Sequence, residues 1–257
     1  MHSMPKLLFK YLSVSDLVRF ERLIDIIEKN HLYWPTRCQL NDPMEGTATT
    51  VYMGYAGCSF HTLNENEDPF LKEKRDKYHL LSLSEDCLSP QMWAYYANSY
   101  NGVCLCYRTD GCFKVAKKVS YVSERPSSCD GEQYDKKKIV SDFLQKQQGW
   151  SHEREWRIIS DERIISDECD KSFFEYGADD LVCIILGHQI SQFIEKEIIK
   201  ELPSQFPILK VYPGLYSFRI LLTTINHTPK PDGSKPHFIK TVDDVYRYIS
   251  RKKSVCQ

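Results

Sequence analysis

Strand-like and helical segments follow one another in irregular order along this chain, and that order limits its fold more than any other feature. Several strand patterns succeed each other with no helix between them, unlike the regular alternation that builds a parallel sheet. The strand patterns cover 7–12, 31–34, 79–85, 102–107, 150–160, 181–187, 208–212 and 217–225, and the helical patterns cover 17–30, 90–102, 136–148, 191–202 and 241–251. The sequence therefore predicts one α+β domain over 1–257, with a mixed, mainly antiparallel sheet and flanking helices.

Helix-capping residues support these boundaries. Ser13 and Ser15 are candidate caps of the first helix, with Asp16 in its first turn. Ser89 caps the second helix ahead of Pro90, and Gly102 is expected to stop it. Thr241 and Asp244 have the spacing of a capping box. Residues 47–78 are expected to form an exposed loop that leads into a short helix, and residues 123–135 to form a second loop.

The overall charge and the cysteines exclude several classes of protein. The formal net charge is −1, so no global basic excess is present to hold nucleic acid. None of the ten cysteines lies in a C-x-x-C pair, which argues against zinc ribbons and thioredoxin-type chemistry. Cys104 and Cys106 alternate on a strand and are expected to be core residues. With no signal peptide and no apolar run of about 20 residues, we expect a cytoplasmic protein that does not enter a membrane.

The segment 149–159, "GWSHEREWRII", brings two glutamates, two arginines and two of the four tryptophans of the chain close together. Read as a strand, it places Glu153, Glu155 and Arg157 on one face, with Trp156 and Ile158 on the other face toward the core. Two carboxylates on one face repel each other unless Arg157, a bound cation or a polar substrate offsets their charge. The plainer alternative is a solvated strand face that carries a Glu–Arg pair.

Other polar groups along the chain are candidate partners of this acid pair. Ser82 and Ser84 share one face of the strand "LSLSE", and the turn "NDPMEG" supplies Asn41, Asp42 and Glu45. The helix segment "MWAYYA" places Trp93 and Tyr96 on one face, with Met92 beside them, and either Tyr96 or Tyr95 could offer a phenol to a pocket. Taken separately, these features are typical of a half-exposed strand, an Asx turn and a packed helix. The sequence has no P-loop, G-x-G-x-x-G, H-E-x-x-H or G-x-S-x-G motif.

The order of these motifs resembles a bacterial family known as domain of unknown function family 2971. The resemblance rests on "LLFKYLS", "LYWPTRCQLNDPMEG", "LLSLSE", "MWAYYANSYNGVCLCY", "WSHEREWRII" and "VCIILG", in that order, and covers about residues 6–190. Residues 191–257 are then expected to complete the domain. Leu12 stands where an arginine often follows the tyrosine in that family, and His152 stands where a tyrosine is common.

A more distant resemblance is to the ADP-ribosyltransferases of the arginine–serine–glutamate class. It implies an ADP-ribosyltransferase-like fold whose first strand supplies a polar residue to an NAD pocket, here Lys10 or Tyr11. By the same resemblance, Ser82 and Ser84 support the pocket, and the E-x-E segment supplies Glu153 and the essential acid Glu155. Asn41, Trp93 and Tyr96 complete the expected NAD-binding set.

This resemblance implies an enzyme that consumes NAD as a substrate and transfers ADP-ribose to water or to a macromolecular acceptor, either protein or nucleic acid. Cleavage of the nicotinamide–ribose bond passes through an oxocarbenium-like cation, which a carboxylate stabilises without any metal. A role as a toxin or phage-defence effector fits that activity. Two alternatives stay open: a metal-dependent nuclease or hydrolase that uses Asp42, Glu45, Glu153 and Glu155, and a non-catalytic binding module associated with defence.

Overall fold

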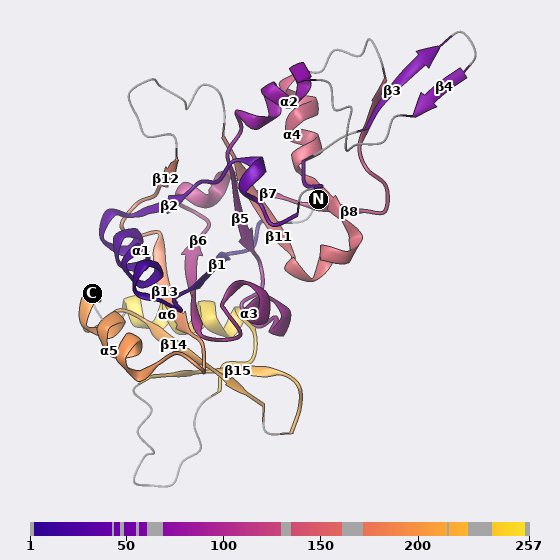
Figure 1. Ribbon diagram of the computed structural model, residues 1–257. Coiled ribbons are helices and arrows are strands. Elements are labelled where there is room, and N and C mark those ends of the chain that lie inside the picture. The colour runs from indigo at the N-terminus through magenta and orange to yellow at the C-terminus, as the bar shows by residue number, and fades with distance from the viewer. Residues whose placement is uncertain are drawn as a thin grey trace, which may run out of the picture.

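An eight-stranded sheet forms the centre of the molecule (Figure 1). The computed structural model describes residues 3–42, 44–46, 49–54, 57–60, 69–129, 135–160, 172–214, 216–225 and 238–254. The strand order is β15-β14-β13-β6-β1-β5-β11-β7, and every neighbouring pair is antiparallel except β13 and β14. The strands are β1 (Leu7–Ser13), β5 (Leu80–Ser84), β6 (Gly102–Arg108), β7 (Lys117–Lys118), β11 (Glu155–Ile159), β13 (Leu181–Leu186), β14 (Ile208–Pro213) and β15 (Ile220–Thr224). The α+β class with a mixed sheet is thereby confirmed.

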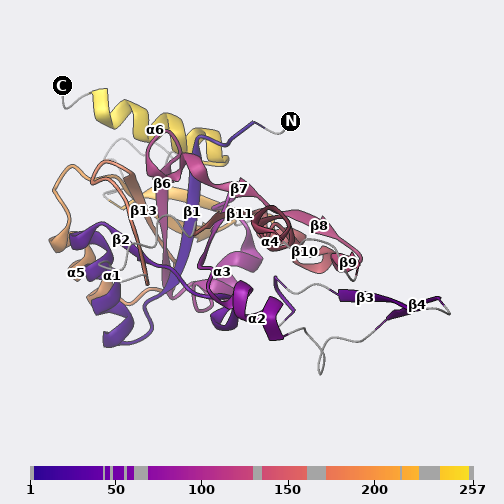
Figure 2. The same ribbon diagram turned by 90° about the horizontal axis from the view of Figure 1, so that it is seen from above.

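Helices cover both faces of this sheet (Figure 2). Helices α1 (Leu17–Lys29) and α5 (Gln192–Glu201) bury Leu23 and Ile198 in a core cluster on one face. Helices α3 (Pro90–Tyr96) and α6 (Val242–Ser254) bury Trp93 and Val245 in a second cluster on the other face. The described part of the chain contains no helix with the length and apolar character that a bilayer crossing requires.

Three smaller sheets flank the central one. Strand β2 (His31–Tyr33) pairs with β12 (Phe173–Glu175), and β8 (Ser120–Val122) pairs in parallel with β10 (Gln145–Gln147). Strands β3 (Thr49–Gly54), β4 (Gly57–Phe60) and β9 (Ser127–Cys129) form the third, and β3 and β4 project away from the body (Figure 2). The remaining elements are the helices α2 (Pro69–Asp76) and α4 (Lys136–Phe143) and the 3₁₀ helices η1 (Arg37–Gln39), η2 (Cys112–Val115) and η3 (Gln148–Glu153).

Two predicted loops contain strands, and one predicted helix is too long. The loop over 47–78 holds the β3–β4 hairpin ahead of α2, and the loop over 123–135 holds β9. The helix over 136–148 stops at Phe143, because the next segment pairs with β8 as strand β10, with Lys146 opposite Tyr121. Tertiary pairing has overridden the local helical pattern there.

The helix that begins at Pro90 also ends earlier than predicted. Ser89 caps it as expected by accepting a hydrogen bond from the Met92 amide, but the helix stops at Tyr96. Asn98, Ser99 and Tyr100 then adopt positive φ angles, which no helix can continue. Gly102 has a different role from a helix stop, because a Cβ there would lie 2.3 Å from the Leu12 carbonyl oxygen of β1.

The other local predictions divide between confirmed and wrong. The cap of α1 is Asp16, whose carboxylate accepts from the Arg19 amide at 2.9 Å, and neither Ser13 nor Ser15 takes that role. Thr241 caps α6 as predicted. Cys104 and Cys106 are fully buried core residues, also as predicted.

Candidate functional site

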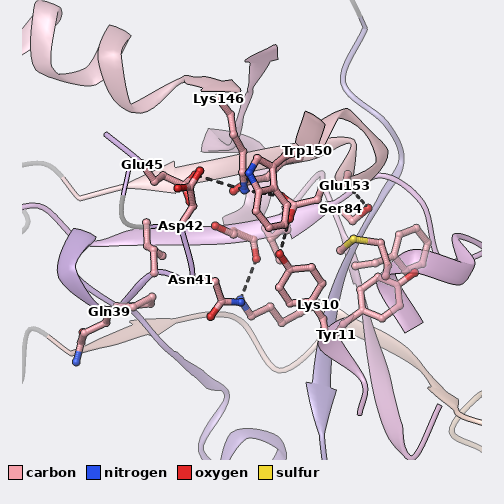
Figure 3. Close-up of a pocket in the computed structure, with 18 residues that line it drawn as sticks. Lys10, Tyr11, Gln39, Asn41, Asp42, Glu45, Ser84, Lys146, Trp150 and Glu153 are labelled. Carbon is pink, nitrogen blue, oxygen red and sulfur yellow. Dashed lines mark hydrogen bonds and ion pairs between the residues drawn. The ribbon is translucent and has the colours of Figure 1, made fainter. Parts of the chain in front are cut away.

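A cavity of about 210 Å³ opens beside strands β1 and β5. Strands β1 and β5 pair at one position, Phe9 opposite Ser84. Side chains of both strands line the cavity next to this pair. The turn at 39–45, the helix α3, the strand β10 and the helix η3 close the other sides (Figure 3). The lining residues are Phe9, Lys10, Tyr11, Pro35, Gln39, Leu40, Asn41, Asp42, Glu45, Ser82, Leu83, Ser84, Met92, Tyr96, Lys146, Trp150, Glu153 and Glu155.

The acid pair reaches this cavity by a route that differs from the predicted strand. Glu153 is the last residue of η3 and Glu155 the first residue of β11, and Arg154 between them is left-handed with φ 48°. The predicted strand over 150–160 is therefore wrong before Glu155, because Gln148–Glu153 coils into a 3₁₀ helix. From Trp156 onward the alternation holds, with Trp156 and Ile158 in the core.

Strand pairing joins the acids to the serines. Glu155 lies opposite Ser84, and Arg157 lies opposite Ser82 in the antiparallel register of β11 and β5. Residues opposite each other on neighbouring strands project from the same face of a sheet. The Ser82 hydroxyl hydrogen-bonds the Glu155 carboxylate, and the Ser84 hydroxyl donates to the Glu153 carbonyl oxygen at 2.7 Å.

Arg157 offsets part of the negative charge of the acid pair. The sequence left three possibilities for this role, namely a bound cation, a polar substrate and Arg157. Its side chain is fully buried, and its Nε and Nη2 atoms donate to the two oxygens of Glu155 at 2.7 and 2.8 Å. Its Nη1 atom donates to the Phe143 carbonyl oxygen at 2.6 Å, and Nη2 also forms an ion pair with Glu45. Bidentate pairs of this kind are among the strongest charge-assisted contacts in proteins.

Lys146 is the second counter-charge, and sequence reasoning missed it. Its ammonium lies 2.5 Å from Glu153, 3.0 Å from Glu155 and 3.4 Å from Glu45, and 5.3 Å from the centre of the Trp150 ring. No local signal marks this residue, because Gln145–Gln147 is polar at all three positions and lies within the helix predicted over 136–148. The contacts depend on β10, whose position is fixed by its pairing with β8.

Burial and mutual charge shift the pKa values of this cluster. Burial raises the pKa of Glu155; the Lys146 charge lowers it, and the Glu153 charge adds to the rise. Burial alone would lower the pKa of Lys146, but the Glu155 and Glu153 charges outweigh that effect and raise it. Burial, followed by the hydrogen bond that Tyr96 donates to Glu153, raises the Tyr96 pKa. The charge states of Glu155, Lys146 and Tyr96 therefore depend on one another and on the charge of Glu153.

Lys10 and Tyr11 enter the cavity from β1, but their bonding differs. The Lys10 ammonium donates to the Ser82 carbonyl oxygen at 3.0 Å, and the Tyr11 hydroxyl donates to the Asp86 carbonyl oxygen at 2.7 Å. Burial lowers the pKa of Lys10 to about 8, against the opposing effect of the Glu155 and Glu153 charges. Lys10 is thus the basic residue of β1 that faces the acid pair.

The structure brings onto one cavity all but one of the residues expected to bind or cleave NAD. Of the two candidate phenols, Tyr96 lines the cavity and Tyr95 is exposed. Asn41 lines the cavity and hydrogen-bonds Tyr96. Trp93 is the exception, because it is fully buried behind the wall, where its Nε1 atom donates to the Cys87 carbonyl oxygen at 2.9 Å. Its ring packs edge-on against Tyr11, so it supports the cavity without lining it. The expectation that Trp93 contacts a cofactor is therefore wrong.

The arrangement does not favour the predicted cation-binding carboxylate cluster. Asp42, Glu45, Glu153 and Glu155 all line the cavity, yet the last three are already ion-paired with Lys146 or Arg157. Within the described ranges, no three His, Cys, Asp or Glu residues are grouped as a metal site requires. An Mg²⁺ ion would have to compete with two buried protein cations for the same oxygens.

Fold and site together define an α+β protein in which a buried cluster of acidic and basic side chains lines a cavity. Residues 92–158, from α3 to the end of the acid-bearing segment, match the model of a family described as "Protein of unknown function (DUF2971)". This match confirms the family resemblance over residues 92–158, and the remainder of the range 6–190 stays a prediction. Comparison with curated proteins and with solved structures finds no match.

Proposed function

We propose that this protein is an NAD-consuming enzyme, either an ADP-ribosyltransferase or an NAD glycohydrolase, and that the cavity holds the nicotinamide ribose of its substrate. The proposal rests on one observation: the serines of β5 and the two acids, Glu153 and Glu155, line the same cavity. The same cavity takes Lys10 and Tyr11 from β1.

The charge of the cavity agrees with a cationic substrate. Four carboxylates and two lysines line it, with Arg157 buried behind Glu155. The nicotinamide ring of NAD is positively charged, and the ribose gains positive charge as the bond breaks. An excess of negative charge in a desolvated site stabilises both.

The volume sets how much of the substrate fits. At about 210 Å³, the cavity is smaller than the roughly 300–1,000 Å³ of pockets that enclose drug-sized ligands. It has room for a ring and its sugar, and the remainder of the dinucleotide would lie toward the cavity mouth.

In the proposed reaction, the bond between ribose C1′ and the nicotinamide nitrogen breaks, and its electron pair neutralises the ring. Glu155 stabilises the resulting sugar cation through its negative charge, and its two oxygens are held by hydrogen bonds from Arg157, Lys146 and Ser82. Glu153 accepts a proton from the attacking water or macromolecular acceptor. Ser82 and Tyr96 hold the two carboxylates in place.

The decisive experiment measures NAD binding and nicotinamide release by the purified protein, alone and with cell extract as a source of acceptors. We expect Glu155→Gln to lower nicotinamide release at least about a hundredfold, the scale of losing one transition-state contact. Glu197→Gln on the exposed side of α5 serves as the matched control and is expected to keep full activity. If the protein neither binds NAD nor releases nicotinamide under any of these conditions, the proposal is wrong.

A folding check accompanies that measurement, because Glu155→Gln leaves Arg157 with a weaker partner. If the variant lowers stability but the wild-type protein never releases nicotinamide, the polar cluster is structural and the chain is a binding module.

We also propose a cellular role as a toxin or phage-defence effector acting in the cytoplasm. The six free cysteines of the described residues agree with a reducing compartment. Expression in bacteria is expected to deplete NAD and slow growth, with Glu155→Gln relieving both effects. Growth arrest at unchanged NAD levels would contradict this role.

A further inference from the structure

Two lysines line the same cavity, and their partners differ sharply (Figure 3). Lys146 is held by three carboxylates within 3.4 Å. Lys10 donates one hydrogen bond, to the Ser82 carbonyl oxygen, and forms no ion pair with any residue that the structure describes. The cavity therefore contains one lysine locked in ion pairs and one that is free to react.

The surroundings shift the equilibrium of Lys10 toward the neutral amine and that of Lys146 toward the ammonium ion. Burial lowers the pKa of Lys10 to about 8, whereas the Glu155 and Glu153 charges raise the pKa of Lys146. A partly buried lysine with a depressed pKa carries a larger share of the free, nucleophilic amine at neutral pH than an ordinary lysine does. The titratable groups that share the cavity with Lys10 are Tyr11, Asp42, Glu45, Tyr96, Lys146, Glu153 and Glu155.

We propose that Lys10 is a nucleophilic amine and that the cavity captures a small polar carbonyl compound, of the size and polarity of a reducing sugar, as an imine. The Lys10 nitrogen lone pair attacks the carbonyl carbon, and a carbon–nitrogen bond forms. The carbonyl oxygen then leaves as water, taking the two amine protons. No oxidant or reductant takes part.

The position of Lys10 suits this chemistry. It lies in the middle of β1, directly opposite Leu105 of β6, so its backbone is fixed by the sheet. The Ser82 and Tyr96 side chains and the acid pair line the same space and offer hydrogen-bond partners to the hydroxyl groups of a sugar. A volume of about 210 Å³ admits a small carbonyl compound of this kind.

This reactivity goes beyond the proposed cleavage of NAD and does not depend on it. Imine formation at Lys10 is assayed without NAD, and nicotinamide release is assayed without an aldehyde. A negative result in one assay therefore refutes only the proposal that this assay tests.

The test uses the full chain, glyceraldehyde as the probe, and cyanoborohydride to reduce the imine to a stable amine. Peptide mapping by mass spectrometry then gives the labelling rate of each lysine at pH 7.4. Lys72, exposed on α2, serves as the internal reference, and Lys146 as the control within the cavity. A pKa near 8 rather than 10.5 gives Lys10 a share of free amine roughly two hundred times larger at this pH.

We expect Lys10 to label at least about tenfold faster than Lys72, after allowance for its restricted access and lower basicity, and Lys146 to stay unlabelled. In urea-unfolded protein the three lysines should label at similar rates. Labelling of Lys10 no faster than Lys72 in the folded chain, or faster labelling of Lys146 than of Lys10, would overturn the proposal. Because this test compares lysines within the wild-type protein, it does not require a Lys10 variant that folds.

Discussion

The substitution Arg157→Met tests the central electrostatic argument, because it removes the counter-charge and keeps a long side chain. Arg157 is fully buried, and its guanidinium neutralises Glu155 through two hydrogen bonds and also pairs with Glu45. Methionine fills most of the same volume. The loss measured is therefore mainly the loss of charge and hydrogen bonding rather than the creation of a cavity.

The expected cost follows from what is left behind. Glu155 and Glu45 are 3% and 7% exposed, and after the substitution they share Lys146 as their remaining buried cation. The Phe143 carbonyl oxygen also loses its donor. Removing one partner of a buried ion pair costs about 3–5 kcal/mol, since the other charge stays buried. We expect Arg157→Met to lower the free energy of unfolding by that amount at pH 7.

Urea unfolding at 25 °C measures the change, with the m-value as the check that folding stays two-state. Arg247→Met is the matched control, because Arg247 pairs with Asp244 on an exposed face of α6, and we expect no measurable loss there. Adding Glu155→Gln to Arg157→Met should recover part of the stability. A loss below about 1 kcal/mol for Arg157→Met, or no recovery in the double variant, would refute the account of this cluster.

Three further outcomes are expected. Trp93→Ala, which empties a fully buried site and leaves the Cys87 carbonyl oxygen without its donor, should cost about 3–5 kcal/mol in urea unfolding, and a loss under about 1 kcal/mol would contradict the packing. Ser89→Ala should cost about 1 kcal/mol through loss of the α3 cap, whereas Ser89→Asp should largely retain it; equal stability of all three proteins would contradict the cap. The third outcome concerns Lys10, whose pKa is lowered from 10.5 to about 8 on folding. The unfolded chain therefore binds more protons at this side chain between those values, and the contribution of Lys10 to the free energy of unfolding rises with pH there. The Lys10→Met protein lacks that rise, so its stability relative to wild type should fall between pH 7 and pH 9.5, and a constant difference would argue against the shift.

Local patterns predicted the elements of the central sheet well. The strand at Leu181–Leu186 is apolar along its whole length, so a buried strand was its natural interpretation. The alternation of leucine and serine at Leu80–Ser84 predicted which face carries the hydroxyls, because side chains on a strand alternate with a period of two. These signals depend only on neighbours in sequence.

The errors occur where a distant segment decides the local structure. Lys146 lies on a strand because β8 pairs with it, although its sequence neighbours favour a helix. Glu153 faces the cavity because the chain turns through the left-handed Arg154, which no alternation rule anticipates. Trp93 has a helical position that pattern alone cannot assign to either the cavity or the core.

The sequence by itself determined the α+β class, the strand that carries the serines, and the presence of two acids two residues apart. Tertiary structure alone decided that these groups share one cavity, that Lys146 and Arg157 neutralise the acids, and that Lys10 has no carboxylate partner among the described residues. The physical reason is the separation along the chain of the residues that interact. Side-chain period and capping act over a few residues, whereas burial and ion pairing join strands that lie far apart along the chain and meet only in the folded sheet.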